Sequence, residues 1–219
     1  MDKIIAPSIL SADFAQLGKE VVDVINSGAD WIHFDVMDNH YVPNLTVGPM
    51  VCRSLREYGI KDFIDVHLMV EPVDQLVEMF AAAGADLISF HPSATNNISE
   101  TIKLIKKHGC KVGMAINPPE NSDIAKEYLN ELDLVLLMSV NPGFGGQKFI
   151  EDVLEKIKDM RAYMDKNKSA ARLEVDGGIN AENIKDVSDA GADTFVLGSA
   201  IFNTDDYQNT ISTLRNNIS

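Results

Sequence analysis

Short apolar segments alternate with amphipathic ones along all 219 residues of the chain. Many of the apolar segments are rich in Val, Ile, Leu or Phe and contain few polar positions, which is typical of parallel strands buried on both faces. The pattern predicts strands at residues 3–10, 31–36, 63–69, 87–91, 111–117, 134–140, 172–176 and 194–198.

The segments between these strands have helical spacing of their apolar residues, and their ends are well marked. The clearest helices are expected at residues 14–27, 75–83, 99–108, 151–166 and 181–190. Glycines suited to ending a helix follow at Gly28, Gly84, Gly109 and Gly191. Ser99 is the expected cap of its helix, because an acidic residue follows it in the first turn.

A short repeat sets the number of strand–helix units. Gly-Ala-Asp closes a helix and opens a strand at residues 28–30, 84–86 and 191–193, and Leu132-Asp133-Leu134 holds a similar place without the glycine. The aspartates recur at intervals of about two strand–helix units. Eight such units without a linker predict a single-domain α/β fold, a (β/α)₈ TIM barrel spanning residues 1–219. A doubly wound open sheet is the alternative.

Charge and composition narrow the classes of partner. The net charge of −14 argues against a nucleic-acid or anionic-membrane surface. No apolar run approaches the ~20 residues that span a bilayer, and the first residues carry no secretory signal pattern. Cys52 and Cys110 lie far apart in the sequence, so we expect reduced thiols in a cytoplasmic protein.

Polar residues concentrate at the carboxyl ends of the predicted strands. In a barrel these ends and the loops after them form one rim, where ligands bind. The rim is therefore the predicted active site. Its polar residues are Ser8, His33, Asp35, His67, His91, Asn117, Ser139, Asn141, Asp176 and Ser199.

Four of these rim residues form a candidate metal site. His33 and Asp35 are two apart on one strand and share a face, while His67 and Asp176 come from two other strand ends. Two imidazoles and two carboxylates suit a divalent transition ion such as Zn²⁺, whereas Mg²⁺ would use fewer histidines. Taken singly, each also fits a buried hydrogen-bonded histidine or a turn aspartate.

Glycine-rich segments form a candidate anion site. Residues 141–147, Asn-Pro-Gly-Phe-Gly-Gly-Gln, let backbone N–H groups converge on a ligand, although they match neither the P-loop nor the dinucleotide fingerprint. The segments 176–178 and 198–199 follow the last two strands, a recurrent phosphate site of barrels. Met37, Met69 and Met138 stand near strand ends as candidate apolar lining.

Six segments together resemble one family. They are residues 6–13 (APSILSAD), 33–38 (HFDVMD), 65–69 (DVHLM), 141–147 (NPGFGGQ), 175–179 (VDGGI) and 198–202 (GSAIF). With these segments the whole chain resembles the ribulose-phosphate 3-epimerase family. One position departs from the family's pattern: Asn39 stands where a glycine usually follows Met-Asp. Asparagine tolerates a positive φ, so we expect the turn to form with some added strain.

The resemblance implies a metal-dependent, cytoplasmic enzyme of the pentose phosphate pathway that interconverts D-ribulose 5-phosphate and D-xylulose 5-phosphate. It implies a phosphorylated ketopentose substrate and a homo-oligomer, and no nucleic-acid or membrane partner. Asp35 and Asp176 would exchange protons at C3 through a metal-stabilised enediolate. One divalent ion per subunit, Zn²⁺ first and Fe²⁺, Mn²⁺ or Co²⁺ otherwise, would be bound by His33, Asp35, His67 and Asp176. The implied substrate contacts are Ser8, His67, Gly143, Phe144, Gly145, Gly146, Asp176, Gly177, Gly178, Gly198 and Ser199.

Three alternatives stay open at the level of sequence. The first is a 3-epimerase acting on a six-carbon ketose phosphate such as allulose 6-phosphate. The second is a lyase, decarboxylase or synthase built on a similar phosphate-binding barrel. The third is a phosphosugar sensor that binds its ligand without turning it over.

Overall fold

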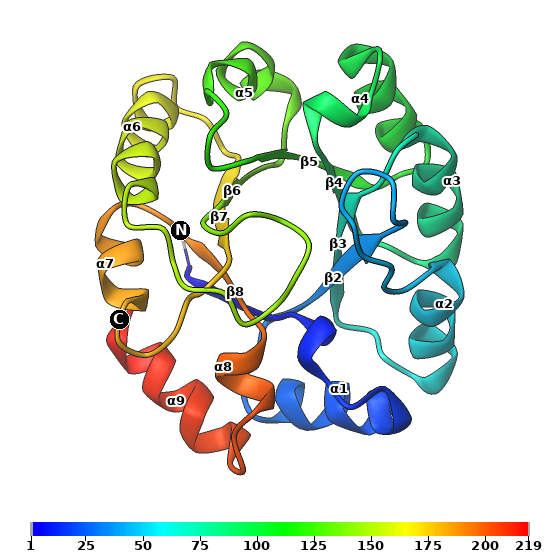
Figure 1. Cartoon of the computed structure of the whole chain (residues 1–219), viewed down its shortest axis with the longest axis vertical. Helices are drawn as coiled ribbons and strands as arrows, with labels where there is room; N and C mark the ends of the chain where they lie inside the picture. The colour runs from blue at the N-terminus through cyan, green and yellow to red at the C-terminus, as the bar shows by residue number, and fades with distance from the viewer. Residues whose placement is uncertain (1, 219) are drawn as a thin grey trace.

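Eight parallel strands form a ring surrounded by helices in the computed structural model, which describes residues 2–218 (Figure 1). All eight predicted strands are present, with ends that differ by a few residues. The first strand is shorter than expected because the Ser8 side chain accepts a hydrogen bond from the Leu10 amide and starts a 3₁₀ turn. The strands are β1 (Ile4–Pro7), β2 (Trp31–Met37), β3 (Phe63–Met69), β4 (Leu87–Phe90), β5 (Lys111–Ile116), β6 (Leu134–Met138), β7 (Arg172–Asp176) and β8 (Thr194–Leu197).

The strand pairing closes the sheet into a barrel. Each strand from β2 to β7 pairs in parallel with the next one in sequence, and β1 pairs with β8. A bridge between Ser8 and His33 places the end of β1 beside β2. The single-domain barrel is the architecture observed, and the doubly wound open sheet is wrong.

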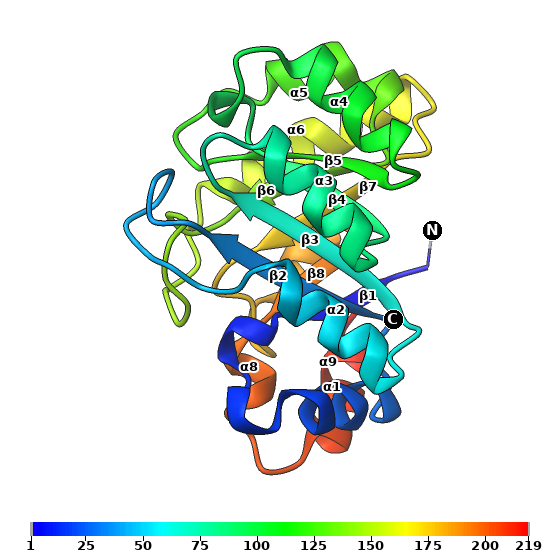
Figure 2. The same ribbon diagram turned by 90° about the vertical axis from the view of Figure 1, so that its right-hand side faces the viewer.

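A helix follows each strand and covers the outside of the ring (Figures 1 and 2). Two helices follow β8, and the first of them is a single short turn at the carboxyl end of that strand. The helices are α1 (Leu17–Asn26), α2 (Pro49–Tyr58), α3 (Asp74–Ala83), α4 (Ile98–Lys107), α5 (Asp123–Tyr128), α6 (Val153–Lys166), α7 (Ile184–Asp189), α8 (Ser199–Phe202) and α9 (Tyr207–Asn217).

The expected cap of α4 is wrong by two residues. Asn97, in extended conformation, accepts a hydrogen bond from the Glu100 amide at 3.3 Å, so the helix begins at Ile98. Ser99 lies inside the first turn. The acidic residue of that turn does occupy the expected place, since Glu100 lies near the positive end of the helix.

The core lies mainly between the ring and the helices. Phe34, Phe90 and Phe195 point outward from their strands and are completely buried there. Because side chains alternate along a strand, the neighbours of Phe34, which are His33 and Asp35, point into the ring. The inside of the barrel carries these polar side chains beside a smaller apolar cluster that includes Leu134 and Leu136, while the larger core lies beneath the helices.

The repeated aspartates lie at the amino-terminal end of the barrel. Each accepts a hydrogen bond from the amide of a residue in the strand before its own: Ile5 for Asp30 (2.8 Å), Ile64 for Asp86 (2.7 Å), Val112 for Asp133 (2.9 Å) and Leu173 for Asp193 (3.3 Å). A basic side chain also pairs with each one: Arg215, Arg56, Lys111 and Arg172. The repeat therefore joins neighbouring strands, and its function is structural.

Two further observations concern the expectations from sequence about membrane-spanning segments and about the two cysteines. Within residues 2–218, no helix combines the length and the apolar character needed to cross a membrane.

Cys52 and Cys110 are both buried free thiols, and burial raises the pKa of the Cys52 thiol to about 11. A thiol that stays protonated is a poor nucleophile.

Candidate active site

Four side chains converge at the carboxyl-terminal end of the barrel. They are His33 and Asp35 of β2, His67 of β3 and Asp176 at the end of β7, and one nitrogen or oxygen from each lies within 4.8 Å of all the others. Asp35 Oδ1 is 3.5 Å from His33 Nε2 and 3.4 Å from His67 Nδ1. Asp176 Oδ2 is 3.9 Å from the same His67 nitrogen.

The donor set fits a divalent transition ion. His33 Nδ1 lies 2.6 Å from Asp65 Oδ2, so the carboxylate accepts the Nδ1 proton and leaves the lone pair of Nε2 free. That Nε2 is buried and has no hydrogen-bond partner within residues 2–218. Two imidazole nitrogens beside two carboxylates match the preferences of Zn²⁺ and its neighbours in the first transition row.

The two carboxyl groups of this cluster have opposite pKa shifts. Burial alone would raise the pKa of Asp35, but His33 and His67 outweigh it and hold that pKa well below its usual range. Burial and the nearby charge of Asp35 raise the pKa of Asp176 to about 8. Ser8 Oγ donates a 2.5 Å hydrogen bond to Asp35 Oδ2 and supports its ionised form. Near neutral pH one carboxyl is ionised and the other protonated, a pairing suited to acid–base catalysis.

A second buried acidic pair lies deeper in the barrel. Asp65 lies two residues before His67 on β3, and its side chain contacts His33 of the neighbouring strand. Glu174 lies beside it and is also fully buried. Burial, followed by the Asp65 charge, raises the pKa of Glu174 well above its usual value, so this carboxyl stays protonated. The sequence analysis missed Glu174, although its spacing from Asp176 on the same strand placed it on the same face.

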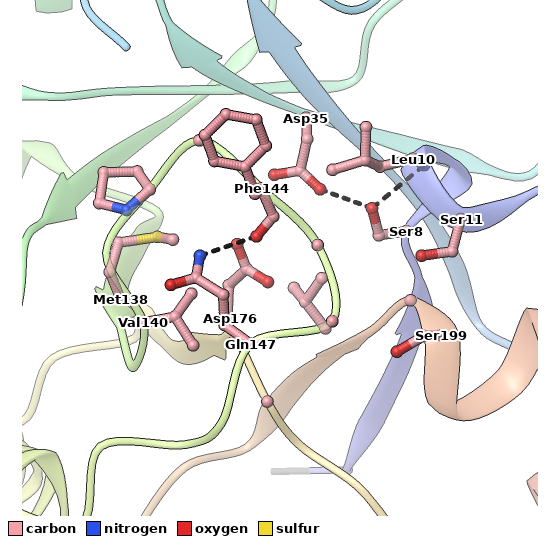
Figure 3. Close-up of a pocket in the computed structure, with 18 of the residues that line it drawn as sticks. Ser8, Leu10, Ser11, Asp35, Met138, Val140, Phe144, Gln147, Asp176 and Ser199 are labelled. Carbon is pink, nitrogen blue, oxygen red and sulfur yellow. Dashed lines mark hydrogen bonds between the residues drawn. The ribbon is translucent and has the colours of Figure 1, made fainter. Parts of the chain in front are cut away.

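A pocket opens directly above the carboxyl pair (Figure 3). Asp35 and Asp176 are part of its wall, and Met37, Met69 and Met138 supply apolar lining where the sequence suggested it. No Lys or Arg lines the pocket in the part of the chain that the structure describes. An anionic ligand in this pocket must therefore be held by backbone groups, by small polar side chains or by a bound cation.

The glycine-rich segments meet at one side of the pocket. The loop between β6 and α6 passes over the barrel mouth, and the segments after β7 and β8 lie beside it (Figures 1 and 3). Gly146 and Gly178 have φ of 73° and 68°, which favour glycine. A Cβ on Gly178 would collide with the backbone of Phe149 and Gln147, so only glycine allows these loops to meet.

Glycines with unpaired backbone N–H groups line this side of the pocket in the described chain. The N–H groups of Gly145, Gly146 and Gly178 form no hydrogen bond within residues 2–218, although all three residues line the pocket. Gly198 and Ser199 line it as well. A cluster of unpaired backbone N–H groups is an anion-binding feature.

Polar side chains fix the loop between β6 and α6 in place. Gln147 Nε2 donates to the carbonyls of Asn141 and Phe144 at 2.7 and 2.8 Å, and Asn44 Nδ2 donates to the Gly143 carbonyl at 2.7 Å. Asn44 had no signal in the sequence, because its loop after β2 reaches Gly143 only in the folded barrel. The Phe144 side chain remains 57% exposed at the mouth.

Other polar residues near the rim lie outside the pocket lining. Asn39 adopts a φ of 64°, so the turn forms as expected with asparagine in place of glycine. Ser139 Oγ donates to the carbonyls of Asp176 and Gly177 and steadies the end of β7. Asn117 bonds to Tyr41 at 2.8 Å and does not line the pocket.

Comparison with known proteins places this arrangement in context. The profile of the ribulose-phosphate 3 epimerase family matches residues 4–202. Ribulose-phosphate 3-epimerase of Serratia marcescens is 56% identical over 205 residues, covering 94% of this chain and 98% of that protein. Ribulose-phosphate 3-epimerase of Escherichia coli (strain K12) is 54% identical over 215 residues, covering 98% and 96%.

A solved structure shares the fold at much lower identity. The crystal structure of KGPDC from Streptococcus mutans superposes with a TM-score of 0.75 at 17% identity, covering 98% of this chain and 96% of that one. At that identity the likeness concerns the barrel alone. The family match and the two relatives, in contrast, extend over nearly the entire chain, and they show that it belongs to the ribulose-phosphate 3-epimerase family.

Proposed function

We propose that this enzyme interconverts D-ribulose 5-phosphate and D-xylulose 5-phosphate by moving protons between C3 and two carboxyl groups, Asp35 and Asp176. The observation that carries the proposal is the opposite pKa shift of these two groups in the wall of one pocket. Family membership supports the same reaction.

Inversion at the carbon beside a ketone needs one base and one acid. In one direction Asp35 takes the proton from C3, and the electrons of the C–H bond pass into an enediolate. Asp176 then gives a proton to the opposite face of C3. In the reverse direction the two residues exchange roles, as general acid–base catalysis requires. Ser8 orients Asp35 by its hydrogen bond to Oδ2.

The metal site is part of the proposal. His33, Asp35, His67 and Asp176 would hold one divalent ion, with Zn²⁺ preferred and Fe²⁺, Mn²⁺ or Co²⁺ accepted by the same donors. When bound, the ion supplies Lewis-acid stabilisation of negative charge that develops on the substrate oxygens. Asp65 keeps the His33 ring oriented for this purpose through its 2.6 Å contact with Nδ1.

The glycine-rich side of the pocket is proposed to hold the phosphate. Backbone N–H groups of Gly145, Gly146, Gly178 and Ser199 would donate to it, with Ser8, Gly143, Phe144, Gly177 and Gly198 completing the substrate contacts. The three methionines exclude water above the carboxyl pair without offering a proton of their own. His67 would contact the substrate as well as the ion.

Metal analysis combined with an epimerisation assay on D-ribulose 5-phosphate tests the proposal. In ²H₂O, substrate and product should both gain deuterium at C3, with one divalent ion per chain. A phosphosugar sensor would bind the sugar without incorporating deuterium. A lyase or decarboxylase would instead release a fragment, and neither of these outcomes is expected.

The choice of substrate needs a direct comparison. The kcat/KM for D-ribulose 5-phosphate should exceed that for allulose 6-phosphate, and the opposite order would reassign the enzyme to six-carbon ketose phosphates. A homo-oligomer in the cytoplasm completes the proposal, on the strength of the family. Light scattering of the purified chain tests the first property, and cell fractionation tests the second.

A further inference from the structure

His91 is a buried histidine whose side chain has one polar contact in the described part of the chain. It follows β4, two residues after Ser89, and therefore points to the inside of the barrel like Ser89. Its Nε2 lies 2.8 Å from Nε2 of His67, and its Nδ1 is buried without a hydrogen-bond partner within residues 2–218. The Tyr41 ring covers the imidazole, with ring centroids 4.8 Å apart.

Burying this polar ring has a cost that packing alone does not explain. A buried nitrogen without a partner is destabilising because it has lost its hydrogen bonds to water, and an apolar side chain could fill the space against Tyr41 without that cost. Among residues 2–218, the contact with His67 is the one interaction of His91 that an apolar residue could not make. The residue at position 91 is therefore best explained by what it does to His67.

The short contact between two nitrogens fixes the position of a proton. Two Nε2 atoms at 2.8 Å require one hydrogen between them, because two lone pairs or two N–H groups would repel each other. His67 directs its Nδ1 at Asp35 and Asp176, at 3.4 and 3.9 Å. If His67 Nδ1 is to give its lone pair to a cation, its own proton must lie on Nε2, and His91 Nε2 must then accept that proton.

We propose that His91 is a positioning residue that accepts a hydrogen bond from His67 Nε2–H and so keeps His67 Nδ1 available to the metal ion. This inference rests on the proposed function, because it concerns the same metal site. His91 then does for His67 what Asp65 does for His33. The two ligand histidines present different ring nitrogens, and each is held by a different buried partner.

Three variants separate this role from simple packing. His91→Phe keeps a planar ring against Tyr41 but removes the acceptor, whereas His91→Gln can place an amide oxygen near the position of Nε2. His108→Gln, on the end of α4 and away from the pocket, is the matched control. Zinc affinity is measured by competition with a chelator of known affinity. Loss of such a supporting partner typically weakens metal binding about 10–100-fold, so we expect that loss in His91→Phe and nearly wild-type affinity in His91→Gln and His108→Gln.

A spectroscopic measurement on the wild-type protein does not depend on any variant folding. In the zinc-loaded protein labelled with ¹⁵N-histidine, the His67 signal should show a proton on Nε2 and none on Nδ1. The His91 signal should show the proton on Nδ1. A proton on His91 Nε2 in the zinc-loaded protein would overturn the inference, as would undiminished zinc affinity in a folded His91→Phe protein.

Zinc binding and epimerisation by the wild-type protein show whether a negative result concerns His91 alone or the proposed function as a whole. Stoichiometric zinc and normal epimerisation in wild type, together with unchanged affinity in His91→Phe, would remove His91 from the site and leave the proposed function intact. A wild-type chain that bound no divalent ion would overturn the proposed metal site and this inference with it.

Discussion

The two ends of the barrel use the same residue type in opposite ways. At the amino-terminal end, Asp193 accepts the Leu173 amide and pairs with Arg172, so its charge is neutralised by fixed donors. At the carboxyl-terminal end, Asp35 and Asp176 face each other and two imidazoles, with no Lys or Arg in the described lining of the pocket. An aspartate with fixed donors stabilises the fold, whereas one facing another carboxyl is available to bind an ion and move a proton.

This difference has an energetic basis. A carboxylate that accepts amide and guanidinium hydrogen bonds prefers the folded state. A carboxyl buried beside another carboxylate disfavours the folded state at neutral pH, and burial together with the charge of Asp35 raises the pKa of Asp176 to about 8. Strain of this kind is expected at functional sites and is compensated elsewhere in the fold.

The largest expected effect is on catalysis. Asp176→Asn should abolish epimerisation in both directions, because an amide cannot exchange the proton and general acid–base groups contribute ~10²–10⁴-fold to rates. Loss of the metal would add to this. Turnover of D-ribulose 5-phosphate and metal content are measured together, and Asp133→Asn at the other end of the barrel is the control that should stay active. Near-normal turnover by a metallated Asp176→Asn protein would end the two-carboxylate mechanism.

Metal binding is the next effect in size. His67→Ala should reduce metal affinity by more than the ~10–100-fold typical of a supporting partner, while folding changes less, because the barrel is held by its aliphatic strands and helices. Metal content and thermal melting are compared with wild type. A fully metallated His67→Ala protein would remove His67 from the ligand set.

The phosphate side of the pocket offers a smaller test. Gly146→Val should reduce kcat/KM strongly, since a branched side chain resists the φ of 73° and occupies open space beside the pocket. Metal content should not change. Lys148→Ala should cost no more than the ~0–1 kcal/mol of an exposed charge. If Lys148→Ala were the more damaging variant, the backbone site for the phosphate would have to be abandoned.

Without metal, Asp176 should destabilise the folded chain as pH rises, whereas the aspartates at the amino-terminal end of the barrel stabilise it. Below pH 3.8 Asp176 is protonated in both states; between 3.8 and about 8 the unfolded chain ionises while the folded one keeps its proton, so wild type loses stability as pH rises. Asp176→Asn cannot lose stability in this way. Chelator-treated Asp176→Asn should therefore melt above wild type at pH 8, with a smaller difference at pH 5. If the difference in melting temperature between variant and wild type were the same at pH 5 and pH 8, Asp176 would not be protonated in the folded chain.

The smallest effect is expected from the structural aspartates. Asp193→Ala should lower the free energy of unfolding by about 1–3 kcal/mol, because it leaves the buried Leu173 amide without its side-chain acceptor. The metal-loaded enzyme should keep its kcat. Urea unfolding measures the first quantity, and a fall in kcat with unchanged stability would show that the two ends of the barrel are not independent.

Much of this molecule follows from local sequence. Buried apolar segments, helix-ending glycines and the repeated Gly-Ala-Asp are sufficient to predict eight strand–helix units, because each reports a short-range preference of the backbone. Period-two alternation likewise places His33 and Asp35 on the inward face of β2. The candidate metal ligands could be brought together for the same reason, since strand ends in a barrel share one rim.

Only the tertiary structure decided how these residues act on one another. It turned Asp65 toward His33, placed the second nitrogen of His67 against His91, and set the pKa of Asp176 through burial and the charge of Asp35. Sequence spacing could not give these relations, because they join different strands and depend on distances of a few ångströms. The sequence determined which groups reach the rim of the barrel, and the packing of the ring determined which nitrogen or oxygen of each remains free for chemistry.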